Sequence, residues 1–260
     1  MKDKSIIVFD SGFGGISVLK RLVASMPNEN YLYYGDSANA PYGSRPKNQV
    51  QELTLNAIAK AKAECEPKAI VIACNTATAA ARELVQSAYP DIPVIGILPA
   101  VEIASTSQDH PNVLVLATAS TVSSDAYLNI LSKIEGTADV VSVAAPEIVR
   151  YVERGMCDRQ SLIDNLTELL APYKNMKFHC VVLGCTHFPF AADVIEEVLG
   201  YPVQFFDGGV LTTKQTEDAL ENQDTRNTQT HSGSIRIINS GNRQDCIGFA
   251  WKLFSTNLNQ

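Results

Sequence analysis

The stretch Leu183-Gly184-Cys185-Thr186-His187-Phe188-Pro189 is the clearest structural signal in the sequence. It follows the apolar run 178–183 and precedes a helical pattern over 190–199. A buried strand that ends at Gly184 therefore places a thiol, a hydroxyl and an imidazole at the start of a helix. The stretch 69–77 repeats this arrangement, with Cys74-Asn75-Thr76 between an apolar run and a helical pattern. Two junctions of the same kind predict two similar halves that face one site.

A cysteine in this position has a definite chemical use. The thiolate is the reactive form, and a helix N-terminus or a nearby protonated histidine can lower the thiol pKa from about 8.5 toward neutrality. Together, at equivalent positions, Cys74 and Cys185 are therefore candidate catalytic groups.

The composition is that of an ordinary globular chain. It has 260 residues, 45% hydrophobic and 19% charged, with a formal net charge of −7. This charge and the lack of a Lys/Arg run argue against a nucleic-acid partner. The N-terminus does not read as a signal peptide, and no apolar run approaches the roughly 20 residues that span a bilayer. We expect a cytoplasmic protein without a membrane partner.

Strand and helix patterns alternate along most of the chain with short glycine-rich turns, which predicts an α/β fold with parallel sheets. The alternation restarts after Pro99, and we expect two similar lobes with the active site between them. The first lobe comprises residues 1–97 plus 209–260, because a tail of about 50 residues is too small to hold a core alone. The second comprises residues 98–208. The polar stretch 221–232 predicts a mobile surface loop.

Polar residues gather where the predicted strands end. Ligands of open parallel sheets bind outside the carboxyl ends of the strands. The residues expected there are Asp10, Ser11, Tyr42, Cys74, Asn75, Thr76, Thr118, Thr121, Cys185, Thr186 and His187.

Two other kinds of site have partial support. The turn 10–15, Asp-Ser-Gly-Phe-Gly-Gly, could cradle phosphate at a helix start, although it departs from G-x-G-x-x-G. A metal site could recruit Cys180, Cys185 and His187, but the six cysteines form no C-x-x-C pair and Cys180 should face away from the junction. We predict no metal.

Taken together, the motifs resemble the glutamate racemases of the aspartate/glutamate racemase superfamily. The resemblance runs from Phe9 to about Asp207, in the family's order and spacing. It rests on the turn 10–15, Gly35-Asp36 with Pro41-Tyr42-Gly43, Cys74-Asn75-Thr76-Ala77, Ala117-Thr118-x-x-Thr121, Val152-Glu153-x-Gly155 and the stretch 183–189. It implies a cytosolic bacterial enzyme that interconverts L- and D-glutamate without a cofactor and supplies D-glutamate for peptidoglycan. We expect a homodimer.

The resemblance also implies the roles of the site residues. Racemisation removes a proton from one face of the α-carbon and delivers one to the other, so two acid–base groups must flank the substrate. By resemblance, Cys74 handles the D-enantiomer proton with Asp10 beside it, and Cys185 handles the L-enantiomer proton with His187 and Glu153. Since the core motifs hold no Arg or Lys, we expect backbone N–H groups and polar side chains to hold the substrate: Asp10, Ser11, Pro41, Tyr42, Gly43, Asn75, Thr76, Thr118, Thr121, Thr186 and His187.

Some positions depart from the family pattern. Gly208 follows Asp207 where serine is common, which leaves the role of Asp207 open, and Ser44 replaces Asn or Thr. Relatives controlled by a peptidoglycan precursor carry an N-terminal extension, so we expect that control to be absent here.

Three alternatives stay open at this point. A sister racemase would act on aspartate or a hydantoin with the same two cysteines, and a substrate panel separates it. A non-catalytic amino-acid-binding protein would keep ligand binding after thiol alkylation. A pyridoxal-dependent racemase would absorb visible light.

Overall fold

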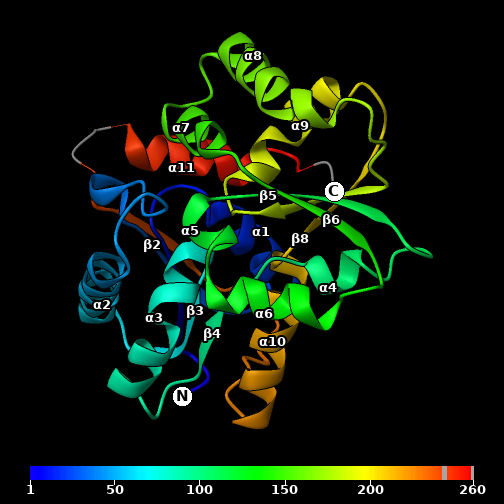
Figure 1. Cartoon of the computed structure of the whole chain (residues 1–260). Coiled ribbons are helices and arrows are strands. Elements are labelled where there is room, and N and C mark those ends of the chain that lie inside the picture. The colour runs from blue at the N-terminus through cyan, green and yellow to red at the C-terminus, as the bar shows by residue number, and fades with distance from the viewer. Residues whose placement is uncertain (242–244, 259–260) are drawn as a thin grey trace.

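The computed structural model describes residues 1–241 and 245–258, and it contains two parallel sheets (Figure 1). The five-stranded sheet has the order β4-β3-β1-β2-β9. Its strands are β1 (Ser5–Asp10), β2 (Asn30–Gly35), β3 (Pro67–Ile72), β4 (Val94–Gly96) and β9 (Ile235–Asn239). The C-terminal β9 pairs with β2, so the end of the chain returns to the first lobe.

The second lobe is built on a four-stranded sheet with the order β6-β5-β7-β8, in which every pairing is parallel. Its strands are β5 (Asn112–Ala117), β6 (Asp139–Ala144), β7 (Cys180–Gly184) and β8 (Gln204–Asp207). The predicted α/β fold with two parallel-sheet lobes is confirmed.

The first sheet is covered by helices on both faces because its strands are apolar on both. In β1, Ile6 and Val8 face one cluster, and Ile7 and Phe9 face the other. The first face packs on α1 (Ile16–Ser25), α10 (Gly209–Asn222) and α11 (Cys246–Ser255), and the second on α2 (Lys47–Glu64) and α3 (Asn75–Ala88).

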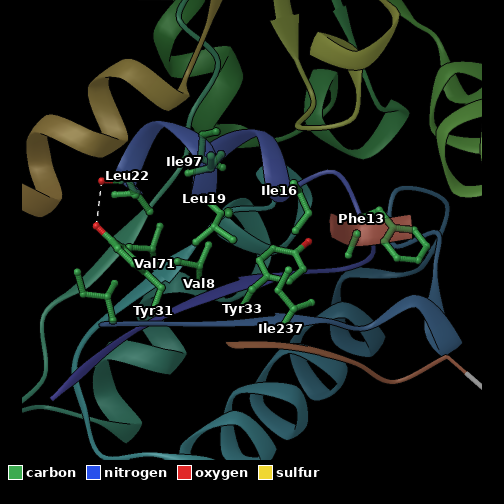
Figure 2. Close-up of a cluster of buried hydrophobic side chains, with 14 of the residues drawn as sticks. Val8, Phe13, Ile16, Leu19, Leu22, Tyr31, Tyr33, Val71, Ile97 and Ile237 are labelled. Carbon is green, nitrogen blue, oxygen red and sulfur yellow. Dashed lines mark hydrogen bonds between the residues drawn. The ribbon is translucent and has the colours of Figure 1, made fainter. Parts of the chain in front are cut away.

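Figure 2 shows the first of these clusters. Leu19 and Leu22 of α1 lie over Val8 and Val71. The buried Tyr31 hydroxyl donates to the Leu22 carbonyl oxygen at 2.9 Å, so its polar end is satisfied inside the core. The close packing fixes α1, and with it the glycine-rich turn that leads into it.

The second sheet has the same construction. One face packs on α7 (Pro146–Glu153), α8 (Arg159–Leu170) and α9 (Ala192–Leu199), and the other on α4 (Val101–Ala104) and α6 (Asp125–Lys133). Figure 1 shows α7, α8 and α9 together above this sheet. One-turn elements complete the fold: α5 (Ala119–Val122) and the 3₁₀ turns η1 (Ser37–Asn39), η2 (Ala171–Tyr173) and η3 (Phe188–Ala191).

The sequence prediction fails in one region. The helix α10 is not among the elements that the sequence predicts. Its last two residues, 221–222, belong to the predicted loop. Thr225 and Asn227 are buried, and the Asn227 amide donates to Glu29 at 2.8 Å. The mobile surface loop predicted for 221–232 is therefore wrong over these residues, because a polar sequence can be held by buried hydrogen bonds.

Within residues 1–241 and 245–258, no helix combines the length and apolarity that crossing a bilayer requires.

Candidate active site

A cavity of about 200 Å³ lies between the two lobes, at the ends of β3 and β7. Pockets for drug-sized ligands span roughly 300–1,000 Å³, so this volume suits a smaller molecule. Both candidate thiols line it, one from each lobe. The lining residues are Ser11, Pro41, Tyr42, Gly43, Ser44, Cys74, Asn75, Thr76, Thr118, Ala119, Pro146, Val149, Arg150, Cys185, Thr186 and His187.

Cys74 follows β3 as the N-cap residue of α3. Its Sγ accepts from the Ala77 amide at 3.5 Å and lies 3.4 Å from the Ser11 hydroxyl. Burial, together with the charge of Asp10, raises the pKa of Cys74 to about 12, although the two hydrogen bonds oppose the rise. The helix N-terminus alone therefore does not make this thiol acidic, contrary to the general expectation from sequence.

Cys185 lies at the start of a chain of contacts that ends in a carboxylate. Its Sγ is 3.6 Å from His187 Nδ1, and His187 Nε2 is 2.6 Å from Glu153 Oε1. Burial lowers the pKa of His187, but hydrogen bonds and charges from Cys185 and Glu153 together raise it well above its usual value. A carboxylate thus holds a protonated imidazole beside the thiol.

The glycine-rich turn before α1 receives this histidine and this carboxylate. A Cβ on Gly12 would lie 2.0 Å from Glu153 Oε1, and one on Gly14 would lie 2.4 Å from His187 Nδ1. The Phe13 amide donates to Glu153 Oε1 at 2.7 Å. The amide that a phosphate would need is therefore committed to a side chain of the other lobe, which argues against a phosphate cradle.

Asp10 lies behind the cavity and outside its lining. It is fully buried, and its carboxylate accepts from the Gly12 amide at 2.8 Å and from the Thr186 hydroxyl at 3.0 Å. Burial raises the pKa of Asp10, while the charge of His187 and these hydrogen bonds lower it in part. Asp10 therefore links the first lobe to the cysteine junction of the second.

Three threonine hydroxyls form a row that joins the two lobes beside the cavity. Thr76 Oγ1 lies 3.0 Å from Thr118 Oγ1, which lies 2.9 Å from Thr121 Oγ1. Thr121 does not line the cavity but holds Thr118 in place. Beside them, Asn75 is 5% exposed, and both polar atoms of its side chain lack a hydrogen-bond partner within the described residues. A buried amide in this state is suited to bind a polar ligand.

The segment 41–44 forms one wall of the cavity. Tyr42 is buried and lines this wall. Its hydroxyl donates to Asp36 Oδ2 at 2.7 Å, so the polar end of the side chain is bound to a residue outside the cavity lining. Ser120 donates to the Gly43 carbonyl oxygen at 2.7 Å, which attaches the wall to the second lobe.

Five lining residues were missed from the sequence: Ser44, Ala119, Pro146, Val149 and Arg150. Three of them come from α7, where the spacing 146, 149, 150 and 153 puts them on the same face as Glu153. Arg150 adds to the cavity lining a cation that the sequence analysis did not place there. Helical spacing from Glu153 was the signal that could have found it.

The structure separates Cys180 from the other two residues of the alternative metal site, Cys185 and His187. Cys180 packs with Val113 and Val115 on one face of the second sheet, while Cys185 belongs to the cluster on the other face. Across residues 1–241 and 245–258, His, Cys, Asp and Glu side chains form no group of three that could hold a metal ion.

Known proteins resemble this chain over nearly its whole length. The family model described as Asp/Glu/Hydantoin racemase matches residues 9–216. A glutamate racemase of Clostridium botulinum is 40% identical over 255 residues, covering 98% of each chain. A glutamate racemase structure from Bacillus anthracis aligns with a TM-score of 0.86 at 27% identity over 99% of this chain and 96% of that one. Another from Francisella tularensis, in complex with D-glutamate, aligns with a TM-score of 0.83 at 28% identity over the same shares.

Two lobes that present one thiol each to a shared cavity, in a chain with these relatives, define an isomerase of the racemase class. The chain belongs to the Asp/Glu/hydantoin racemase family.

Proposed function

We propose that the enzyme interconverts L- and D-glutamate by a two-thiol acid–base mechanism. The observation that carries the proposal is that Cys74 and Cys185 line one small cavity from opposite lobes. A proton can then leave the α-carbon on one face and arrive on the other, with one thiol as base and the other as acid. The glutamate racemase relatives, one of them in complex with D-glutamate, support glutamate as the substrate.

The surroundings of the two thiols divide the work. Cys185, beside His187 and Glu153, takes the proton of L-glutamate, and Cys74 handles the proton of D-glutamate. Burial, followed by the charge of Asp10, raises the pKa of Cys74 and so favours its protonated form. Asn75, Thr76, Thr118 and Thr186 bind the polar groups of the substrate, and the backbone of segment 41–43 closes the site.

No step of this mechanism calls for a cofactor, because both proton-transfer groups are side chains. In the cell, the proposed enzyme is cytoplasmic and supplies D-glutamate for peptidoglycan synthesis, which would make it a determinant of cell shape. The proposal includes a homodimer, for which sedimentation measurements are the test.

The proposed lobe boundary, residues 1–97 plus 209–260 against residues 98–208, has structural support; 242–244 and 259–260 lie outside the described residues. The two segments at which the chain passes between the lobes lie against each other at Leu98 and Gly208. A Cβ on Gly208 would lie 2.1 Å from the Leu98 carbonyl oxygen. Arg21 of α1 pairs with Asp207 at 2.6 Å across the lobes. Asp207 is therefore given a structural role at the junction.

Incubation of each glutamate enantiomer with the enzyme in D₂O tests the function. We expect deuterium at the α-carbon and loss of optical rotation from both enantiomers, after dialysis against chelator and without added pyridoxal phosphate. Racemisation of aspartate or a hydantoin in place of glutamate would contradict the substrate assignment. Glutamate binding without α-deuteration would contradict the enzymatic proposal.

A further inference from the structure

The catalytic cavity has a cation at its edge in a protein of strongly negative charge. The chain carries a formal charge of −7, which repels an anionic amino acid at long range. Arg150 is the one Arg or Lys among the described residues that line the cavity. No Asp or Glu belongs to that described lining either, and the charge of its protonated His187 is balanced by Glu153, so Arg150 dominates the local charge at the edge.

The position of Arg150 follows from helix geometry. Pro146, Val149 and Arg150 lie on the face of α7 that borders the cavity. The guanidinium pairs with Glu147, three residues earlier, and the side chain of Arg150 is 53% exposed. Exposed pairs of this kind contribute little because water competes for both groups. Arg150 can therefore exchange Glu147 for another carboxylate at low cost.

Arg150 also borders a second cavity of about 670 Å³, which shares Pro41, Val149 and Arg150 with the catalytic one. The guanidinium thus stands where the two spaces meet. An anion that approaches the thiols from the larger space passes Arg150.

We propose that Arg150 is a specificity-determining residue, which draws the anionic substrate to the cavity and pairs with one of its carboxylates in place of Glu147. This inference rests on the proposed function, since it requires an acidic amino acid as substrate. Arg150 supplies the positive charge. The hydroxyl groups of the cavity and the Asn75 side chain determine which shape of ligand fits. Glu147 competes with the substrate for the guanidinium, so the two side chains act in opposite directions.

Steady-state kinetics of four variants with D- and L-glutamate test the proposal. We expect R150Q to raise KM about three- to tenfold, as befits a partly exposed pair, with kcat nearly unchanged. R150K should recover most of the loss, because the charge is kept. E147Q should lower KM, because it frees the guanidinium and removes a negative charge. R159Q is the matched control, because Arg159 is a partly exposed, carboxylate-paired arginine that lines neither cavity, and it should leave KM unchanged.

The ionic-strength dependence gives a second readout that a purely structural role would not move. The kcat/KM of the unaltered enzyme should fall as salt is raised, and this dependence should weaken in R150Q. Unchanged KM in R150Q, equal effects of R150Q and R159Q, or a rise of KM in E147Q would overturn the proposal. If the unaltered enzyme leaves glutamate unchanged, the proposed function fails instead, so the two failures are distinguishable.

Discussion

Replacing Gly14 with alanine tests whether the glycine-rich turn is there to admit the histidine of the other lobe. A Cβ at this position would lie 2.4 Å from His187 Nδ1 and 2.6 Å from Thr186 Oγ1. Ordinary contacts begin at about 3.5 Å, so the imidazole would have to move by about 1 Å. Both neighbours are at least 97% buried and have little room to do so.

The expected magnitude follows from this displacement. A shift of about 1 Å in a catalytic group costs on the order of 100-fold in rate, and overpacking costs about 1–3 kcal/mol of the free energy of unfolding. G14A should therefore racemise glutamate about 100-fold more slowly, as measured by circular dichroism, and should melt several degrees lower.

The matched control is G248A, because a Cβ on Gly248 of α11 meets nothing within 4 Å. Alanine is the better helix former by about 0.5–1 kcal/mol, so G248A should keep its rate and melt no lower than the unaltered enzyme. If G14A keeps its rate within about threefold and its melting temperature, the role assigned to the turn is wrong.

Three further predictions address the thiols and their partners. C74S should slow α-proton exchange in D₂O mainly from D-glutamate, and C185S mainly from L-glutamate, because a hydroxyl abstracts protons poorly. Equal losses of the exchange rate from both enantiomers in either variant would contradict the assignment. E153Q should lower the pKa of His187, so the alkaline limb of the pH–rate profile should move to lower pH. Iodoacetamide at neutral pH should label exposed Cys157 well before buried Cys74, whose raised pKa disfavours the thiolate, as peptide mass spectrometry can show.

The pH dependence of stability has the same origin. Since the folded-state pKa of His187 lies above its unfolded value, the protonated histidine stabilises the fold fully below about pH 6.5. That contribution is lost as the pH rises through the folded-state pKa. E153Q should reduce this contribution of His187 to the free energy of unfolding.

Local periodicity was sufficient to predict the fold. Strands such as β1 and β7 are continuous apolar runs between glycine-rich turns, and that pattern specifies a parallel sheet covered on both faces. The helix α10 was not predicted because its sequence is rich in Thr, Lys, Gln, Glu and Asp and has few apolar positions. Its burial of Thr212 and Thr216 depends on hydroxyls that donate to the carbonyl four residues earlier, which periodicity does not reveal.

The site was predictable where its residues follow strand ends and was missed where they come from a helix side. Cys74 and Cys185 are fixed by local chain geometry, so sequence alone located both. Arg150 enters the cavity because α7 is packed against the second sheet, and this packing joins segments far apart in sequence. The contact of Gly14 with His187 depends in the same way on how the two lobes meet.

The two thiols occupy electrostatically different environments, and that difference bears on the direction of the first turnover. Burial and Asp10 favour the protonated form of Cys74, whose pKa is raised to about 12. His187, with a raised pKa, carries its positive charge 3.6 Å from Cys185 Sγ. A racemase needs one acid and one base at the start, and the raised pKa of Cys74 suits it to the role of acid that the proposed mechanism gives it. In the mechanism proposed above, an enzyme in this state accepts L-glutamate first and delivers the proton of Cys74 to form D-glutamate. The return reaction requires the proton to change sides, so the proposed mechanism assigns the preference of the substrate-free enzyme to Asp10 and His187 beside the thiols.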